Sequence, residues 1–73
     1  MNKDDIEQLR KDLVDINFVD GENKIRLYEL LTKLEEEGLD DYEKEEFVQI
    51  VEDEVDVGEK LKEFSDELVK DLS

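Results

Sequence analysis

The chain has 73 residues, of which 25 are Asp or Glu and 10 are Lys or Arg, so its formal net charge is −15 at pH 7. This length limits the chain to a single domain, 1–73, close to the size below which one hydrophobic core is barely sufficient. With no Cys and no His, it has no disulfide, no thiolate metal site and no imidazole base, and its charge repels a phosphate backbone, which argues against direct nucleic-acid binding.

The first predicted element is an amphipathic helix near the N-terminus. Its apolar side chains recur at intervals of three and four, as on one helical face: Ile6, Leu9, Leu13 and Ile16. Asn2 or Asp4 can cap its start. The turn-forming residues at 17–21 then interrupt the pattern.

A second helix is predicted from about Glu22 to Glu37. We expect its buried side to consist of Ile25, Leu27, Tyr28, Leu31 and Leu34. Gly38 follows where a left-handed cap residue is wanted, and Leu39 can fold back onto the end of the helix. The sequence therefore predicts a sharp helix end at this glycine.

Asp40 starts the third predicted helix, with Glu43 three residues later as its capping-box partner. The apolar members of this helix are Tyr42, Phe47, Ile50, Val51 and Val55. The helix boundary that follows is open. Asp56 with Glu59 can cap a fourth helix, and Gly58 weakens helical continuity. The apolar side chains nevertheless keep the same helical phase beyond Gly58, as one helix over 41–72 would require. We favour a break near 56–58, and the fold class is a small all-α bundle of three or four short helices.

The residue types argue against an enzyme and against a cofactor. Besides the two tyrosines, the hydroxyl groups are Thr32, Ser65 and Ser73, with no His or Cys to activate them. The segment 15–26 fails as a calcium loop, because Gly21 falls at position 7 when Asp15 is position 1. We therefore expect neither a catalytic nor a metal site.

Two further patterns concern localisation. No apolar run exceeds two residues, so no segment is expected to span a membrane. The first residues are polar and acidic, unlike a signal peptide. A cytoplasmic protein is expected, and usage rich in Lys, Glu and Ile suits a low-GC bacterium or its phage.

The acidic residues are concentrated in the second half of the chain. Residues 1–34 carry eight acidic and six basic side chains, whereas residues 35–73 carry seventeen and four. Glu35, Glu36 and Glu37 come at the C-terminal end of the second helix, where the helix dipole makes each acid unfavourable by about 0.3–1 kcal/mol. Residues placed where they destabilise a helix, with no neighbour that offsets the cost, are candidates for a functional role.

Carboxylates four residues apart on a helix are roughly 6 Å apart, similar to successive phosphates of a nucleic acid. Such rows are Asp41-Glu45, Glu52-Asp56-Glu59-Glu63 and Glu63-Glu67-Asp71. The pattern predicts a DNA mimic that docks onto a basic nucleic-acid-handling protein and inhibits it, in an anti-defence or immunity-like role. The predicted partner-binding residues are Glu36, Glu37, Asp40, Asp41, Glu45, Glu46, Glu52, Asp53 and Asp56. Crowding is expected to raise the pKa of these carboxyls.

Three alternatives remain open. The charge can serve only solubility. The chain can be disordered until it binds, although regular apolar spacing argues against that. It can also be a regulator, an antitoxin or a homodimer that uses a C-terminal apolar stripe, formed by Leu61, Phe64, Leu68 and Leu72.

One segment also resembles a known family. Residues 39–51 combine a capping acid before Tyr42, the pair Glu46-Phe47 and then Gln49. This segment is similar to the first helix of the colicin-type nuclease immunity proteins, which are acidic four-helix inhibitors of DNases. In that family the helix lies near the N-terminus, and a segment with two tyrosines and a proline makes the recognition contacts, whereas this chain has no proline. We therefore do not assign the chain to the family.

Overall fold

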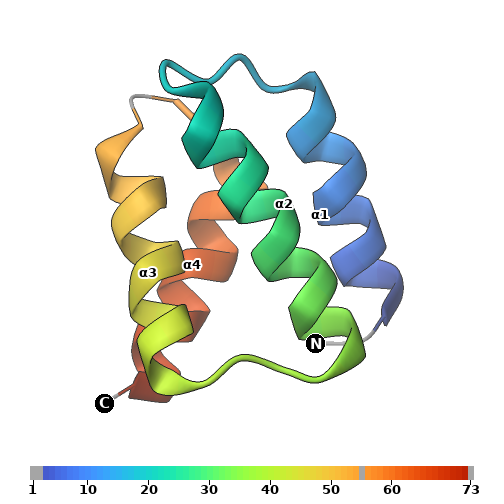
Figure 1. The fold of residues 1–73 in the computed structure, drawn as a ribbon, viewed down its shortest axis with the longest axis vertical. Coiled ribbons are helices and arrows are strands. Elements are labelled where there is room, and N and C mark those ends of the chain that lie inside the picture. The colour runs from blue at the N-terminus through green and yellow to red at the C-terminus, as the bar shows by residue number, and fades with distance from the viewer. Residues whose placement is uncertain (1–2, 55, 73) are drawn as a thin grey trace.

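The computed structural model describes residues 3–54 and 56–72, and within them the chain forms four α-helices and no strand. The helices are α1 (Lys3–Asp15), α2 (Gly21–Glu36), α3 (Asp41–Asp53) and α4 (Glu59–Leu72). They run alternately up and down, and short connections join them at the two ends of the bundle (Figure 1). The prediction of a small all-α bundle is confirmed, with four helices in the described residues.

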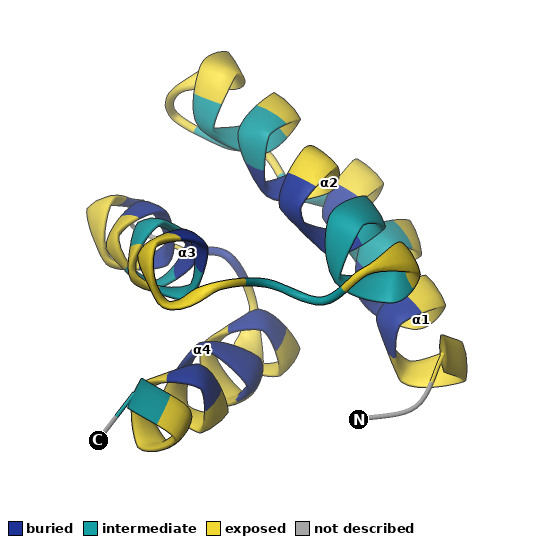
Figure 2. Ribbon diagram, turned by 60° about the horizontal axis from the view of Figure 1, so that its bottom comes forward, coloured by how far each residue is buried: buried dark blue, intermediate teal, exposed yellow. Residues whose placement is uncertain are grey.

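The four helices are arranged as two pairs. Helix α1 packs on α2, α3 packs on α4, and contact between α2 and α3 joins the pairs. The buried parts of all four helices face the middle of the molecule, and the exposed parts face outward (Figure 2). The radius of gyration is 11.1 Å, which matches about 11 Å expected for a compact chain of this length.

The core is centred on an aromatic pair that joins α3 to α4. The Phe47 and Phe64 rings meet edge to face, with their centroids 5.4 Å apart and their planes at 87°, a geometry that aromatic rings favour. Val57, in the α3–α4 connection, is also completely buried. The remaining buried apolar side chains are Ile6, Leu9, Leu13, Leu27, Leu30, Leu31, Ile50, Val51, Leu61 and Leu68.

The predicted junction between α2 and α3 is confirmed. Gly38 has a φ of +89°, and its N–H donates to the carbonyl oxygen of Lys33 at 3.1 Å, which closes the end of α2. Asp40 then caps α3, because its side chain accepts from the backbone N–H of Glu43 at 2.8 Å and the Glu43 side chain accepts from the Asp40 N–H at 3.2 Å. Leu39 packs, half-buried, against the core.

The predicted cap of α1 needs a correction. Helix α1 begins at Lys3, so Asp4 is inside the first turn and is not the cap. At that position its negative charge still suits the positive end of the helix dipole. The other predicted cap, Asn2, lies outside the described residues.

The break predicted near 56–58 is confirmed, since α3 ends at Asp53 and α4 begins at Glu59. Gly58 has a φ of +86°, a conformation that ends helical continuity. The Asp56 carboxylate accepts from the Gly58 N–H at 3.1 Å, so it closes a turn before α4 rather than forming the predicted capping box with Glu59. Val55 lies outside the described residues.

Three apolar residues predicted to be buried are exposed: Ile25 by 63%, Tyr28 by 45% and Tyr42 by 74%. Successive residues are turned by about 100° around a helix, which places Ile25 nearly opposite Leu27. Similarly, the residue of α3 that shares the face of Phe47 one turn earlier is Glu43, not Tyr42. Glu43 is only 8% exposed, so the predictions failed where residue type and helical phase disagreed.

Candidate acidic interaction surface

The nine carboxylates predicted to bind a partner follow α3 from one end to the other. Glu36 and Glu37 end α2, Asp40 precedes α3, and Asp56 lies in the connection to α4. The other five are on α3 itself: Asp41, Glu45, Glu46, Glu52 and Asp53. We call these nine residues the acidic face. Because α3 rises by about 1.5 Å per residue, its 13 residues extend the face over roughly 20 Å.

Four members of the acidic face have partners within the protein. Asp40 caps α3, and Asp56 accepts from the Gly58 N–H. Asp53 accepts from the Gln49 side chain at 3.1 Å. Glu46 is half-buried and forms a two-pronged contact with Arg26, with both N···O distances at 2.9 Å.

The other five members are exposed, and within residues 3–54 and 56–72 none of them forms an ion pair or a side-chain hydrogen bond. They are Glu36, Glu37, Asp41, Glu45 and Glu52. Their charges are therefore available to a partner without breaking an internal contact. Tyr42, between Asp41 and Glu45 in sequence, adds an exposed aromatic ring to the same surface.

Two basic side chains form contacts within the α1–α2 half of the fold. Arg10 of α1 reaches Glu35 at 2.6 Å and lies over the Tyr28 ring at 6.0 Å. The Lys24 ammonium donates to the carbonyl oxygens of Val14 and Ile16, at 2.9 Å each, and so closes the end of α1. These contacts hold two positive charges on the α1–α2 pair, whereas α3 carries six acidic side chains and one basic side chain, Lys44.

The seam between α2 and α3 is held by three polar contacts in antiparallel order. Lys33 binds Glu43 at 2.6 Å, Arg26 binds Glu46, and Asn23 binds Glu54 at 3.0 Å. We call these the seam contacts. They link the whole length of α3 to α2 and hold the acidic face in place.

The seam contacts shift the pKa values of the groups they join. The hydrogen bond from Lys33, followed by the Asp40 N–H, lowers the pKa of Glu43, and the same contact raises the pKa of Lys33. The hydrogen bond from Arg26 lowers the pKa of Glu46. The predicted rise in pKa is therefore wrong for Glu46, since its cationic partner outweighs its acidic neighbours.

Glu54 is a buried, hydrogen-bonded carboxylate that the sequence analysis missed. It is 7% exposed and accepts from Asn23, from the Val19 N–H at 2.7 Å and from the Asp20 N–H at 3.3 Å. These donors lower its pKa, with the Asn23 contact contributing most. The carboxylate thus ties the α1–α2 connection to the end of α3. A pattern in the sequence could have predicted this role. Glu43 and Glu54 both share the helical phase of the apolar residue Phe47, and a charged residue in that phase indicates a buried group with hydrogen-bond partners.

The helix break also corrects one predicted row of carboxylates. The row Glu52-Asp56-Glu59-Glu63 requires a continuous helix, but α3 ends at Asp53 and α4 begins at Glu59. The row Glu63-Glu67-Asp71 does fall on one helix, α4. It belongs to a different part of the surface from the acidic face.

The apolar stripe of α4 is part of the core. Leu61, Phe64 and Leu68 are 1%, 5% and 3% exposed, and Leu72 is half-buried. They cover α3 in the same protein, so the stripe as a whole is not an exposed apolar surface, although edges of Phe64 and Leu68 line hollows on the side of α1. The α4 face on which the alternative function depends is therefore occupied.

Across residues 3–54 and 56–72, no three acidic side chains come together in a way that could hold a metal ion. None of the four helices is both long enough and apolar enough to cross a membrane. Comparisons with protein-family models, with curated proteins and with solved structures found no match.

Proposed function

We propose that this chain is a non-enzymatic inhibitor that docks its acidic face onto the nucleic-acid-binding surface of a basic protein. One observation carries the proposal: five exposed carboxylates that form no ion pair or side-chain hydrogen bond in the described residues lie along α3 and the end of α2, with Lys44 as the one basic residue of α3. In a basic groove, the carboxylates of such a surface can take the place of the nucleic-acid phosphates that normally bind there.

The fold supports the proposal by fixing the helix that carries the charges. The seam contacts and the Asp40–Glu43 capping box hold α3 at both ends. Because the helix backbone is already ordered, binding restricts only the side-chain rotamers of the exposed carboxylates. Association is expected to be fast and steeply weakened by salt.

The experiment is a binding assay against a panel of purified basic nucleic-acid enzymes: a restriction enzyme, a DNase, a CRISPR effector and a polymerase. Complexes are detected by size-exclusion chromatography at ~50 mM and ~500 mM NaCl, where charge screening differs strongly. We expect a complex with at least one enzyme at low salt, its loss at high salt, and competition by duplex DNA.

The triple variant Asp41→Lys, Glu45→Lys, Glu52→Lys tests which surface binds. Its matched control is Glu7→Lys, Asp15→Lys, Asp66→Lys, which changes the net charge equally at exposed positions away from the acidic face. The first variant should lose binding and the control should retain it. Equal loss in both would show a general charge effect, and the absence of any complex at low salt would refute the proposal.

A further inference from the structure

Helices α1 and α4 form the least closed side of the bundle. Each packs mainly on its neighbour in sequence, α1 on α2 and α4 on α3. The Lys60 ammonium reaches Asp12 of α1 at 3.6 Å, but the Lys60 side chain is 67% exposed. An ion pair so open to solvent contributes little to stability, so it does little to close this side.

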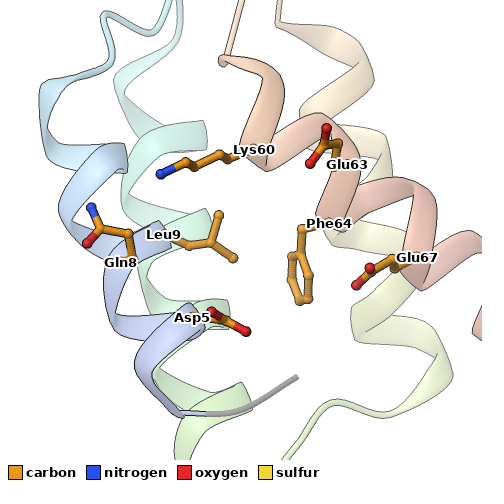
Figure 3. Close-up of a pocket in the computed structure, with 7 residues that line it drawn as sticks. All are labelled: Asp5, Gln8, Leu9, Lys60, Glu63, Phe64 and Glu67. Carbon is orange, nitrogen blue, oxygen red and sulfur yellow. The ribbon is translucent and has the colours of Figure 1, made fainter.

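A groove with an apolar floor follows this opening. Leu9 of α1 and Phe64 of α4 point toward one another across a hollow of about 220 Å³ (Figure 3). A second hollow of about 310 Å³ shares Phe64 with the first and extends to Ile6 and Leu39. We call the two hollows together the α1–α4 groove. The first is smaller than typical cofactor or drug-sized sites, which measure about 300–1,000 Å³, so it suits a single side chain of a partner.

The rim of the groove carries four acidic side chains and two basic ones, since Lys60 lines the first hollow and Lys44 lines the second. Glu63 and Glu67 of α4 line the first hollow, Asp5 lies opposite on α1 (Figure 3), and Asp71 lines the second hollow. The α4 acids are spaced by four residues, roughly 6 Å apart on one helical face. An apolar floor between acidic rims complements an apolar side chain that is flanked by basic ones.

Charge also argues against other occupants. A second copy would bring another −15 to the same rim, and an anionic membrane would be repelled in the same way. A basic helix avoids both problems, because residues three or four positions from an apolar anchor lie beside it on the helix.

We infer that the α1–α4 groove binds a basic amphipathic helix of a partner protein. One aliphatic side chain of that helix enters between Leu9 and Phe64, and flanking Lys or Arg side chains pair with Glu63 and Glu67. This is the helix-in-groove mode of recognition. The inference does not depend on the proposed function, because the groove lies between α1 and α4, whereas the acidic face follows α3.

The probe is a synthetic 18-residue helical peptide with Leu at positions three and four apart and Lys elsewhere. A matched peptide has Ser in place of every Leu and the same charge. Binding to the ¹⁵N-labelled full chain is followed by amide chemical shifts and by fluorescence anisotropy. We expect the Leu peptide to bind more tightly and to shift signals around Leu9 and Phe64.

Two sets of variants locate the site. Glu63→Lys with Glu67→Lys should weaken binding roughly tenfold, as the loss of two ion pairs implies, whereas Asp41→Lys with Glu45→Lys should weaken it less than about threefold. Gln8→Trp changes an exposed residue that lines the first hollow, and should block the Leu peptide while the helical circular dichroism stays unchanged.

Any of four results would overturn the inference. The Leu and Ser peptides could bind equally, the shifted signals could lie on α3, or the Leu peptide could fail to bind at ~1 mM, weaker than about −4 kcal/mol. Unchanged binding to the folded Gln8→Trp variant would also refute it. None of these results would refute the proposal for the acidic face, which is tested by different variants and different partners.

Discussion

Glu43 and Glu54 lie about three helical turns apart at opposite ends of α3, both buried, and donors from the α1–α2 half of the protein fix each of them. Lys33 holds the first and Asn23 holds the second. A buried carboxylate is tolerated only when it is hydrogen-bonded in this way. The pair therefore connects stability to function, since it sets the position of the helix that carries most of the acidic face.

Removing the charge of Glu54 should lower stability. Glu54→Gln replaces one acceptor oxygen by an amide NH₂, which then faces either the Val19 N–H at one oxygen position or the Asp20 N–H and Asn23 amide at the other. Leaving a buried donor unsatisfied is costly, so we expect the melting temperature to fall by several degrees in circular dichroism. The control is Glu52→Gln, an exposed change two residues away, which should leave it nearly unchanged. Equal melting temperatures for the two variants would contradict the role assigned to Glu54.

The seam contacts also predict how stability depends on pH. The pKa values of Glu43, Glu46 and Glu54 are lowered in the fold, so their contribution is complete above the unfolded value of about 4.3 and is lost as the pH falls through the folded values. The pKa values of Lys33 and Arg26 are raised, so their contributions are lost only in strong base.

The melting temperature should therefore not fall between pH 7 and pH 5, and should drop below about pH 4.5. Thermal scans at half-unit steps from pH 7 to pH 3 measure this. The double variant Glu43→Gln, Glu54→Gln should start lower and lose less in acid, because two of the three titrating groups are gone. A steady fall from pH 7 to pH 5 in the unmodified chain would contradict this assignment.

Reversing charge at the end of α2 should raise stability while it weakens partner binding. Glu36 and Glu37 are exposed acids at the negative end of a helix dipole, so Glu36→Lys and Glu37→Lys should each add about 0.3–1 kcal/mol to the free energy of unfolding. Urea denaturation measures the gain. The control is Glu7→Lys within α1, where no such gain is expected. If neither lysine substitution raises the free energy of unfolding, Glu36 and Glu37 do not destabilise the helix, and their position no longer indicates a functional role.

The helix break at Gly58 can be tested against a second glycine. Gly58 has a φ of +86°, whereas Gly21 at the start of α2 does not have a positive φ. In the left-handed region a side chain costs about 1–2 kcal/mol, so Gly58→Ala should be destabilising by that amount. Gly21→Ala should be neutral or slightly stabilising. Both substitutions meet open space, so equal effects in urea denaturation would show that backbone conformation is not the cause.

The features that local sequence predicted well are those made by residues close together in the chain. The Asp40–Glu43 capping box joins residues three apart, and the Gly38 N–H bonds a carbonyl five residues back. Such contacts depend on short-range geometry alone, so the α2–α3 junction could be predicted without knowledge of the fold. The same holds for the helix break at Gly58 and for the concentration of acids in the second half.

The features that failed, or that could not be predicted, depend on contacts between distant segments. Tyr42 was expected to be buried because it is aromatic, but packing of α3 on α4 through Phe47 turns it outward and turns Glu43 inward. The donors of Glu54 lie 31 to 35 residues earlier in the chain.

The amount and distribution of charge, the helical class and the helix ends thus follow from the sequence by itself, because they depend on composition and on hydrogen bonds between near neighbours. Only the tertiary structure decided which carboxylates are exposed and unpaired and which hold the bundle together. The physical reason is that burying a carboxylate is costly without donors, and those donors come from helices that meet only when the chain has folded.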